Sequence, residues 1–251
     1  MRRFPLLFVI GLFSFQVFSQ EQMPKNLPAF DLKRLHFGFT VGLNTMDVAL
    51  NRNYNPVNET GEPLPFVYAD LSSLQPGFQV TVVSDLRLNQ NWNLRFLPGI
   101  SFGQRDLYFY KDPRDQENIP TFKDPLHKES IGAGFLEFPL LFKYRSDRVN
   151  NYRPYLVGGL NFRYDMVAKK RGDTYDDDVN EYVKFIPGDI YLEFGFGIDN
   201  YLKYFKFAPE IKVAMGLRNI LDDFPRPGYA EYTNSISSAR SFIVMLNFHF
   251  E

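Results

Sequence analysis

Apolar and polar residues alternate along most of the chain, and the pattern is clearest over Asp189–Arg218. Every second residue is apolar in Ile190–Ile198, and the same rhythm resumes in Phe205–Leu217. A period of two indicates extended strands with one apolar face and one polar face. The few residues between the two halves leave room only for a hairpin turn. Both halves reach the about 9–11 residues that a strand needs to cross a bilayer, so the strand length indicates a membrane.

The same alternation predicts eight strands in the whole chain. They cover residues 35–44, 78–88, 93–110, 135–144, 155–165, 190–199, 205–217 and 242–250. Pro98 predicts a bulge or break in the third strand, because proline cannot donate to the ladder. Short turns at about 89–91, 146–151 and 201–204 alternate with long loops at about 47–75, 111–132, 167–187 and 219–239. This pattern predicts an all-β fold, an eight-stranded antiparallel up-and-down transmembrane β-barrel with short periplasmic turns and four long extracellular loops.

A soluble lipocalin-type barrel also alternates, so the period alone leaves the direction of the two faces open. The polar face combines isolated charges with many glycines, which suits a crowded lumen better than a solvated surface. Aromatic residues flank the short turns, as in the interfacial girdle of a membrane barrel: Trp92, Tyr144, Tyr152, Tyr201 and Tyr204. Composition therefore favours the outer membrane, with both chain ends on the periplasmic side.

The N-terminal region predicts export. Residues 1–19 combine two arginines with a short apolar run and end at Ser19, which is typical of a secretory signal peptide. Residues 20–34 carry two prolines and no periodicity, so we expect an extended periplasmic tail before the barrel, which spans residues 35–251. The chain has no cysteine and therefore no disulfide. Without the two signal-peptide arginines acidic residues outnumber basic ones, so no nucleic-acid partner is expected.

Candidate chemistry is sparse. His36 and His249 lie on polar faces of the first and last strands, which closure makes neighbours, and we expect structural roles for them. An eight-stranded barrel is just wide enough for side chains to fill, so no open channel is expected. The acidic run Asp173–Asp178 is either a calcium site or a solvated charged loop. We therefore expect no catalytic residue, no metal, no cofactor and no small-molecule substrate.

Four stretches resemble the PorT (also SprT) family of Bacteroidota. They are KNLPAFDLKRLHFGFTVGLN (Lys25–Asn44), LEFPLLFKYR (Leu136–Arg145), GFGIDNYLKYFKFAPEIKVAMGLRN (Gly195–Asn219) and SFIVMLNFHFE (Ser241–Glu251). The resemblance implies a non-enzymatic outer-membrane barrel required for type IX secretion, and for gliding motility where the organism glides. It implies outer-membrane lipids and other secretion components as partners, and it carries over no catalytic residue. A small barrel enzyme that modifies lipid or lipopolysaccharide, and a passive structural barrel, are the alternatives.

The tail combines two apolar residues with a charge, which a bare linker does not need. Leu27, Pro28, Phe30 and Asp31 either dock a periplasmic partner or anchor the tail against the rim of the barrel. The sequence leaves both roles open.

Charge predicts the register of two hairpins. If a two-residue turn joins Tyr201 to Tyr204, Asp199 lies opposite Lys206 and Glu193 opposite Lys212. A shift by two residues in one direction would oppose two carboxylates, which destabilises a sheet. Around the Asn89–Asn91 turn the same reasoning pairs Asp85 with Arg95. We therefore predict Glu193–Lys212 and Asp85–Arg95 as neighbours in the lumen.

Overall fold

The computed structural model describes residues 24–58, 60–65, 67–71, 75–111, 125–171, 183–222 and 230–251. The predicted signal peptide and the acidic run Asp173–Asp178 lie outside the described residues. The strands are β1 (Leu35–Arg52), β2 (Val67–Leu71), β3 (Pro76–Arg87), β4 (Trp92–Phe96), β5 (Gly99–Lys111), β6 (His127–Arg145), β7 (Tyr152–Asp165), β8 (Gly188–Tyr201), β9 (Lys206–Gly216) and β10 (Ile236–Phe250). The helices are short: η2 (Phe30–Leu32), α2 (Met166–Arg171) and α3 (Ala230–Asn234). Across these described residues, no helix is long and apolar enough to cross a membrane.

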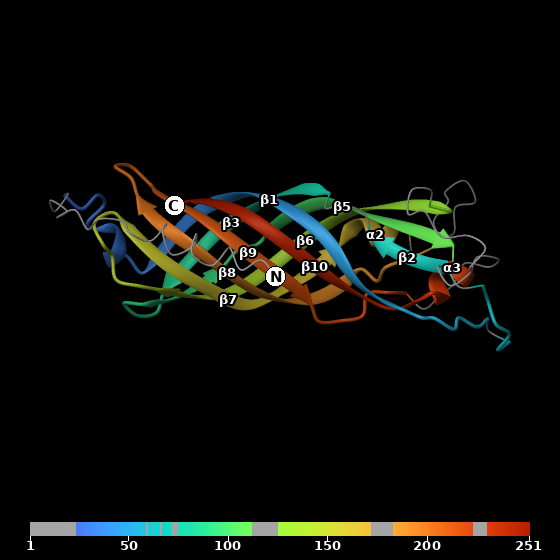
Figure 1. Ribbon diagram of the computed structural model, residues 1–251. Helices are drawn as coiled ribbons and strands as arrows, with labels where there is room; N and C mark the ends of the chain where they lie inside the picture. The colour runs from blue at the N-terminus through green and yellow to red at the C-terminus, as the bar shows by residue number, and fades with distance from the viewer. Residues whose placement is uncertain are drawn as a thin grey trace, which may run out of the picture.

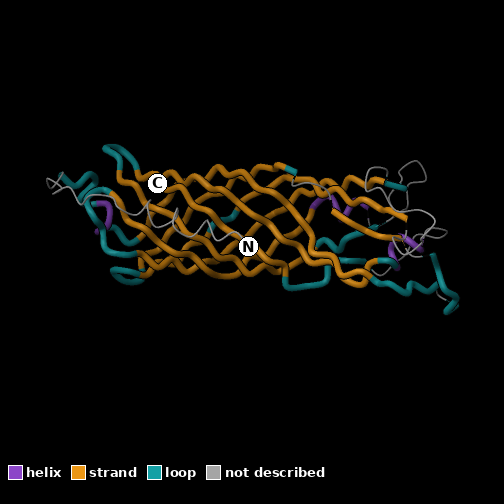
Figure 2. Tube along the Cα trace, in the orientation of Figure 1, coloured by secondary structure: helices purple, strands orange, loops and turns teal. Residues whose placement is uncertain are grey.

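The strands close into one antiparallel barrel (Figures 1 and 2). Neighbouring strands pair in chain order, and β1 closes the ring by pairing with both β3 and β10. β4 and β5 share one position, because each pairs with β3 and with β6. The interruption between them falls at Leu97-Pro98, where the break at Pro98 was predicted. The ring thus has eight strand positions, which confirms the predicted all-β up-and-down barrel.

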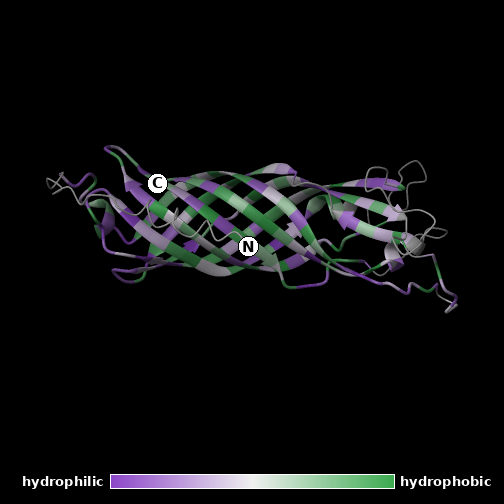
Figure 3. Cartoon of the chain, viewed as in Figure 1, coloured by the Kyte–Doolittle hydropathy of each residue, from purple (hydrophilic) through white to green (hydrophobic). Residues whose placement is uncertain are grey.

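The two faces of the barrel wall point in the directions that a membrane requires. Large apolar side chains cover the outside, where Phe37 is 66 % and Phe142 52 % exposed. Charged side chains point inward, and Asp85, Arg95 and Glu193 have no exposed surface at all. A soluble lipocalin-type barrel would place these classes the other way round, so that alternative is wrong. Figure 3 shows the alternation along each strand.

The apolar outer band ends part of the way along β1. The outward residues are Leu35, Phe37, Phe39, Val41 and Leu43, followed by Thr45, Asp47, Ala49 and Asn51. The inward residues change in the opposite sense, because Met46 and Val48 are buried. A strand that leaves the hydrocarbon region must exchange its faces in this way, since water replaces lipid outside it. The membrane boundary on β1 therefore lies near Thr45.

Several strands continue beyond this boundary, which corrects the predicted loop bounds. β1, β6 and β10 extend into the predicted loops 47–75, 111–132 and 219–239, and α2 and α3 lie in the third and fourth. β2 was not predicted, and it pairs with the outer part of β5. These extensions enclose an apolar core formed by Val48, Val67, Ala69, Leu107, Phe109, Ile131, Val183, Phe185, Ile220, Leu221, Ile236 and Ala239. We call this end, with α2, α3 and β2, the long-loop end (Figure 1).

The opposite end of the barrel carries the connections 88–91, 146–151 and 202–205, and we call it the short-turn end. Glu251 and the segment 24–34 also lie there (Figure 1). Trp92 and Tyr144 contact each other on the outside, with ring centroids 5.0 Å apart, as the predicted girdle requires. Tyr201 was expected in the same girdle but is buried in the lumen, because it continues the inward face of β8 two residues after Asp199.

Candidate functional site

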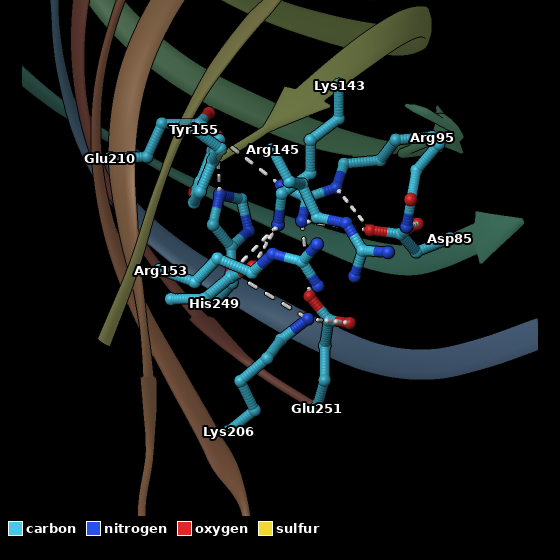
Figure 4. A network of polar contacts seen from close by, with 12 residues as sticks. Asp85, Arg95, Lys143, Arg145, Arg153, Tyr155, Lys206, Glu210, His249 and Glu251 are labelled. Atoms are coloured by element: carbon cyan, nitrogen blue, oxygen red, sulfur yellow. Dashed lines mark hydrogen bonds and ion pairs between the residues drawn. The ribbon is translucent and has the colours of Figure 1, made fainter. Parts of the chain in front are cut away.

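The lumen of the short-turn half is filled by charged side chains that pair across the barrel (Figure 4). Arg95 on β4 is the central cation. Its guanidinium lies 3.1 Å from Asp85 on β3, 3.4 Å from Glu210 on β9 and 3.2 Å from Glu251, which follows β10. Burying a lone ion costs several kcal/mol, so charges in a closed barrel must be compensated by partners from other strands. Arg95 therefore links strands on opposite sides of the ring.

Two lysines continue this network. Lys143 Nζ on β6 lies 2.8 Å from Asp199 on β8. Lys206 Nζ on β9 lies 2.7 Å from the Glu251 carboxylate and 3.7 Å from Asp199. Because both lysines share Asp199, and Lys206 shares Glu251 with Arg95, the charges form one connected set.

A second group of charges lies further from the short turns. Lys212 Nζ is 2.6 Å from Glu193 Oε2, and Arg163 Nη2 contacts Glu193 at 3.3 Å and Glu137 at 3.1 Å. Asn161 Nδ2 donates to Glu193 at 2.7 Å. These side chains close the middle of the lumen in the same way as the Arg95 network closes its short-turn half.

The predicted pairing of Asp85 with Arg95 is present in the structure. The two residues are direct cross-strand partners, and Asn93 also donates to the Asp85 carboxylate. Leu88 N–H donates to Trp92 C=O at 2.9 Å, which closes the turn where the sequence placed it. The turn was assigned correctly, so the register followed from it.

The predicted register of β8 and β9 is wrong by two residues. Lys212 lies opposite Gly195, not Glu193, and Tyr201 lies opposite Lys206. The physical reason is the connection, which contains four residues, 202–205, instead of two. Glu193 and Lys212 nevertheless form an ion pair in the lumen, because diagonal neighbours on one face are within reach of long side chains. Asp199 and Lys206 are likewise diagonal neighbours in the lumen.

His249 stands in a line of groups that resembles part of a catalytic triad. Thr40 Oγ1 lies 2.6 Å from His249 Nδ1, and His249 Nε2 lies 3.3 Å from Glu210 Oε2. All three residues are at least 99 % buried. The Glu210 oxygen also accepts from the Tyr155 hydroxyl at 3.0 Å and contacts Arg95. A substrate has no access to this hydroxyl through the packed lumen, so the arrangement serves packing and charge compensation.

The tail folds back into the mouth of the short-turn end instead of extending away from it. Asp31 in η2 accepts from Tyr201 OH at 3.0 Å. Its carboxylate also lies 3.3, 3.6 and 3.4 Å from Arg145, Arg148 and Arg153, respectively. The Asp31 backbone carbonyl accepts from Arg87. The expected extended tail is therefore corrected to a short helix that is held by the rim.

Other tail residues contribute unequally to this contact. The Phe30 ring stacks on His36 with centroids 4.0 Å apart. Asn26 Nδ2 donates to Tyr201 C=O at 2.9 Å. Leu27 is half-buried and Pro28 is exposed, so of the four predicted tail residues Phe30 and Asp31 carry the anchoring. Sequence reasoning missed the three arginines, although their clustering around one short turn was a usable signal.

An apolar groove of about 430 Å³ lies on the outside where β10 ends. It is lined by Phe37, Gly38, Phe39, Phe205, Phe250 and Glu251. β1 pairs with β10 only from Phe39 onward, so the preceding residues of β1 leave the groove open. No group of three or more His, Cys, Asp or Glu suited to a metal ion occurs within the described ranges. The candidate calcium run lies outside them.

Comparisons with known proteins found a matching family model and solved structures of low sequence identity. Neisserial surface protein A is 10 % identical, with a TM-score of 0.40, and the match covers 86 % of this chain and 98 % of that one. The outer membrane protein OprG from Pseudomonas aeruginosa is 11 % identical, with a TM-score of 0.46, and the match covers 86 % and 93 %. A comparison with curated proteins found no match. The family model described as outer membrane protein beta-barrel domain matches residues 18–222. The chain belongs to this family of outer-membrane β-barrel proteins.

Proposed function

We propose that the chain is a non-enzymatic accessory barrel of the type IX secretion system, required for protein secretion and for gliding motility where the organism glides. The short-turn end faces the periplasm in this proposal, with both chain ends there. The observation that carries it is the place where the four PorT-like stretches meet. These stretches supply Asp31, His36, Lys143, Arg145, Asp199, Lys206 and Glu251, which lie together at the short-turn end. The resemblance is spread over most of the chain, and each of the four stretches contributes to this one surface.

The closed lumen supports an accessory role over a conducting one. The Arg95 network spans the barrel in the short-turn half, and Glu193 with its partners fills the middle. Loop residues Phe185 and Leu221 join the apolar core at the long-loop end. A secreted protein therefore cannot pass through this barrel, and its contribution to secretion must come from surfaces that bind other components.

The enzymatic alternative depends on Thr40, His249 and Glu210. Barrel enzymes that modify lipid need their nucleophile at the rim or on the outside, where lipid can reach it. These three groups are buried in the lumen. A passive structural barrel is the blander alternative, and it predicts no secretion defect when the protein is removed.

Other secretion components would contact the short-turn rim, including the exposed part of the tail. Pro28 and Leu32 face solvent, and Leu32 is 75 % exposed, while Phe30 and Asp31 face the barrel. Replacing Pro28 and Leu32 by Ser should therefore reduce secretion at unchanged barrel abundance. Replacing Phe30 should instead lower abundance and secretion together.

Deletion of the gene in a secreting bacterium tests the proposal. Type IX cargo should accumulate in the periplasm, while the lipid composition of the outer membrane stays unchanged. Complementation with His36→Gln plus His249→Gln should restore export, provided that the variant barrel reaches the outer membrane. Normal cargo export in the deletion strain would contradict the secretion role, and altered lipid A with normal export would favour the enzyme.

A further inference from the structure

The mouth at the short-turn end has the chemistry of a binding site for a carboxylate. Arg145, Arg148 and Arg153 converge on Asp31 from β6, the connection 146–151 and β7. Their side chains are at most 9 % exposed. Within the described part of the chain, Asp31 is the only carboxylate at ion-pair distance from these arginines. Three cations thus face one anion, and charge-assisted bonds of guanidinium to carboxylate are among the strongest in proteins.

The short turns of the barrel supply most of the backbone contacts of these arginines, and the tail adds one, from Arg148 to the Asn26 carbonyl. Arg153 donates to the backbone carbonyls of Ser146 at 2.6 Å and Gln90 at 2.9 Å. Arg148 Nε donates to Asn150 C=O at 2.9 Å. Because the turns fix the guanidinium groups, the site stays formed when its occupant leaves. Such preorganisation lowers the entropic cost of binding.

An aromatic site adjoins the carboxylate site. Phe30 stacks on His36 at an interplanar angle of 15° and meets the Tyr201 ring edge-on, with centroids 6.0 Å apart. Lys206 Nζ lies 5.0 Å from the centre of the Phe30 ring. The mouth therefore contacts two neighbouring side chains of the tail, namely an aromatic ring and the carboxylate that follows it.

We propose that the mouth is a receptor for a partner-protein segment in which an aromatic residue precedes a carboxylate, with Phe30-Asp31 as its built-in occupant. The occupant is held by a helix of only three residues, and the excess positive charge favours a partner with more than one carboxylate. A tethered occupant acts at an effective concentration of about 1 mM. A partner segment must therefore bind the mouth more tightly than the tail does, or bind while the tail is out of the mouth. This inference stands whether or not the barrel serves secretion.

A peptide-binding measurement on the full chain in detergent micelles tests this proposal. The probe is a fluorescein-labelled peptide with the sequence of residues 24–34, followed by anisotropy. The full chain with Phe30→Ala and Asp31→Asn should bind the probe at least tenfold more tightly than the wild type, because its own tail no longer competes. Adding Arg148→Gln to that variant should remove binding, whereas adding Lys203→Gln, at an exposed turn position on the same rim, should not. Heat-modifiable migration on gels verifies that each variant is a folded barrel.

Two further peptides separate a peptide receptor from a simple anion site. Probes with Asp31→Asn or with Phe30→Ala should each bind at least tenfold more weakly than the parent probe. The proposal is overturned if the tail variant does not bind the parent probe up to millimolar concentration, or if all three probes bind equally. It is also overturned if inorganic phosphate or anionic phospholipid vesicles displace the probe as effectively as the unlabelled peptide does. The site would then recognise negative charge alone.

Discussion

Arg95 and Glu251 lie 156 positions apart in the sequence, and their side chains meet at 3.2 Å in the short-turn half of the lumen. The contact joins the strand after the first short turn to the residue that follows β10. It can form only in a closed barrel, so it couples closure of the ring to neutralisation of its buried charges.

Replacing Arg95 by Ala should destabilise the barrel by about 3–5 kcal/mol, because Asp85, Glu210 and Glu251 would lose their shared cation inside a closed lumen. Urea unfolding in lipid vesicles, followed by tryptophan fluorescence, measures the loss. Lys203→Ala at an exposed turn position is the matched control and should stay within about 0.5 kcal/mol of the wild type. A loss of less than about 1 kcal/mol for Arg95→Ala would show that the network is not a stabilising core.

The exchange of faces along β1 predicts a sharp positional effect. Val41→Arg places a charge on the lipid-facing side and should cost about 2–4 kcal/mol, whereas Ala49→Arg, on the same side beyond Thr45, should cost about 0–1 kcal/mol. The free energy of folding into vesicles gives both values. Equal costs at the two positions would place the membrane boundary elsewhere.

Two glycines provide a test of how closely β1 and β10 pack where the barrel closes. A methyl group added at Gly38 would collide with the backbone carbonyl of Phe250, while one added at Gly132 would meet nothing within 4 Å. Gly38→Ala should therefore lower the midpoint temperature of heat-modifiable migration, and Gly132→Ala should leave it unchanged. Similar midpoints for the two variants would mean that β1 and β10 are less closely paired than described.

The register of β8 and β9 can be tested by disulfide trapping, since the chain has no native cysteine. Phe194 and Val213 are direct partners, so Cys residues at these two positions should cross-link under mild oxidation. A Phe194→Cys, Ile211→Cys pair matches the register expected from charge alone and should cross-link poorly. If the second pair cross-linked better than the first, the two-residue turn between β8 and β9 that was expected from sequence would be correct.

The fold was predictable from sequence because alternation is a local property. Each strand shows its two faces without reference to its neighbours, and Asp85–Arg95 followed from a turn that was assigned correctly. Where a connection was misjudged by two residues, the register of β8 and β9 shifted by the same amount. The outer part of β1 was missed because inward Met46 and Val48 reverse the pattern outside the membrane.

The candidate site was less predictable, because its contacts join distant segments. Thr40 meets His249 only through closure of the ring, and Asp31 meets Arg145 and Arg153 only when the tail folds back. The local pattern of the tail residues allows both an anchored and a docking tail. The choice between a docking tail and an anchored tail therefore depended on three-dimensional placement, which assigned Phe30 and Asp31 to the barrel.

The most direct test of a closed, charge-filled lumen is the conductance of the purified protein in planar lipid bilayers. With folded barrels inserted, as verified by heat-modifiable migration, the wild type should give no discrete conductance steps in 1 M KCl. Discrete, reproducible steps from the wild-type barrel would contradict the closed lumen and with it the accessory role proposed for this protein.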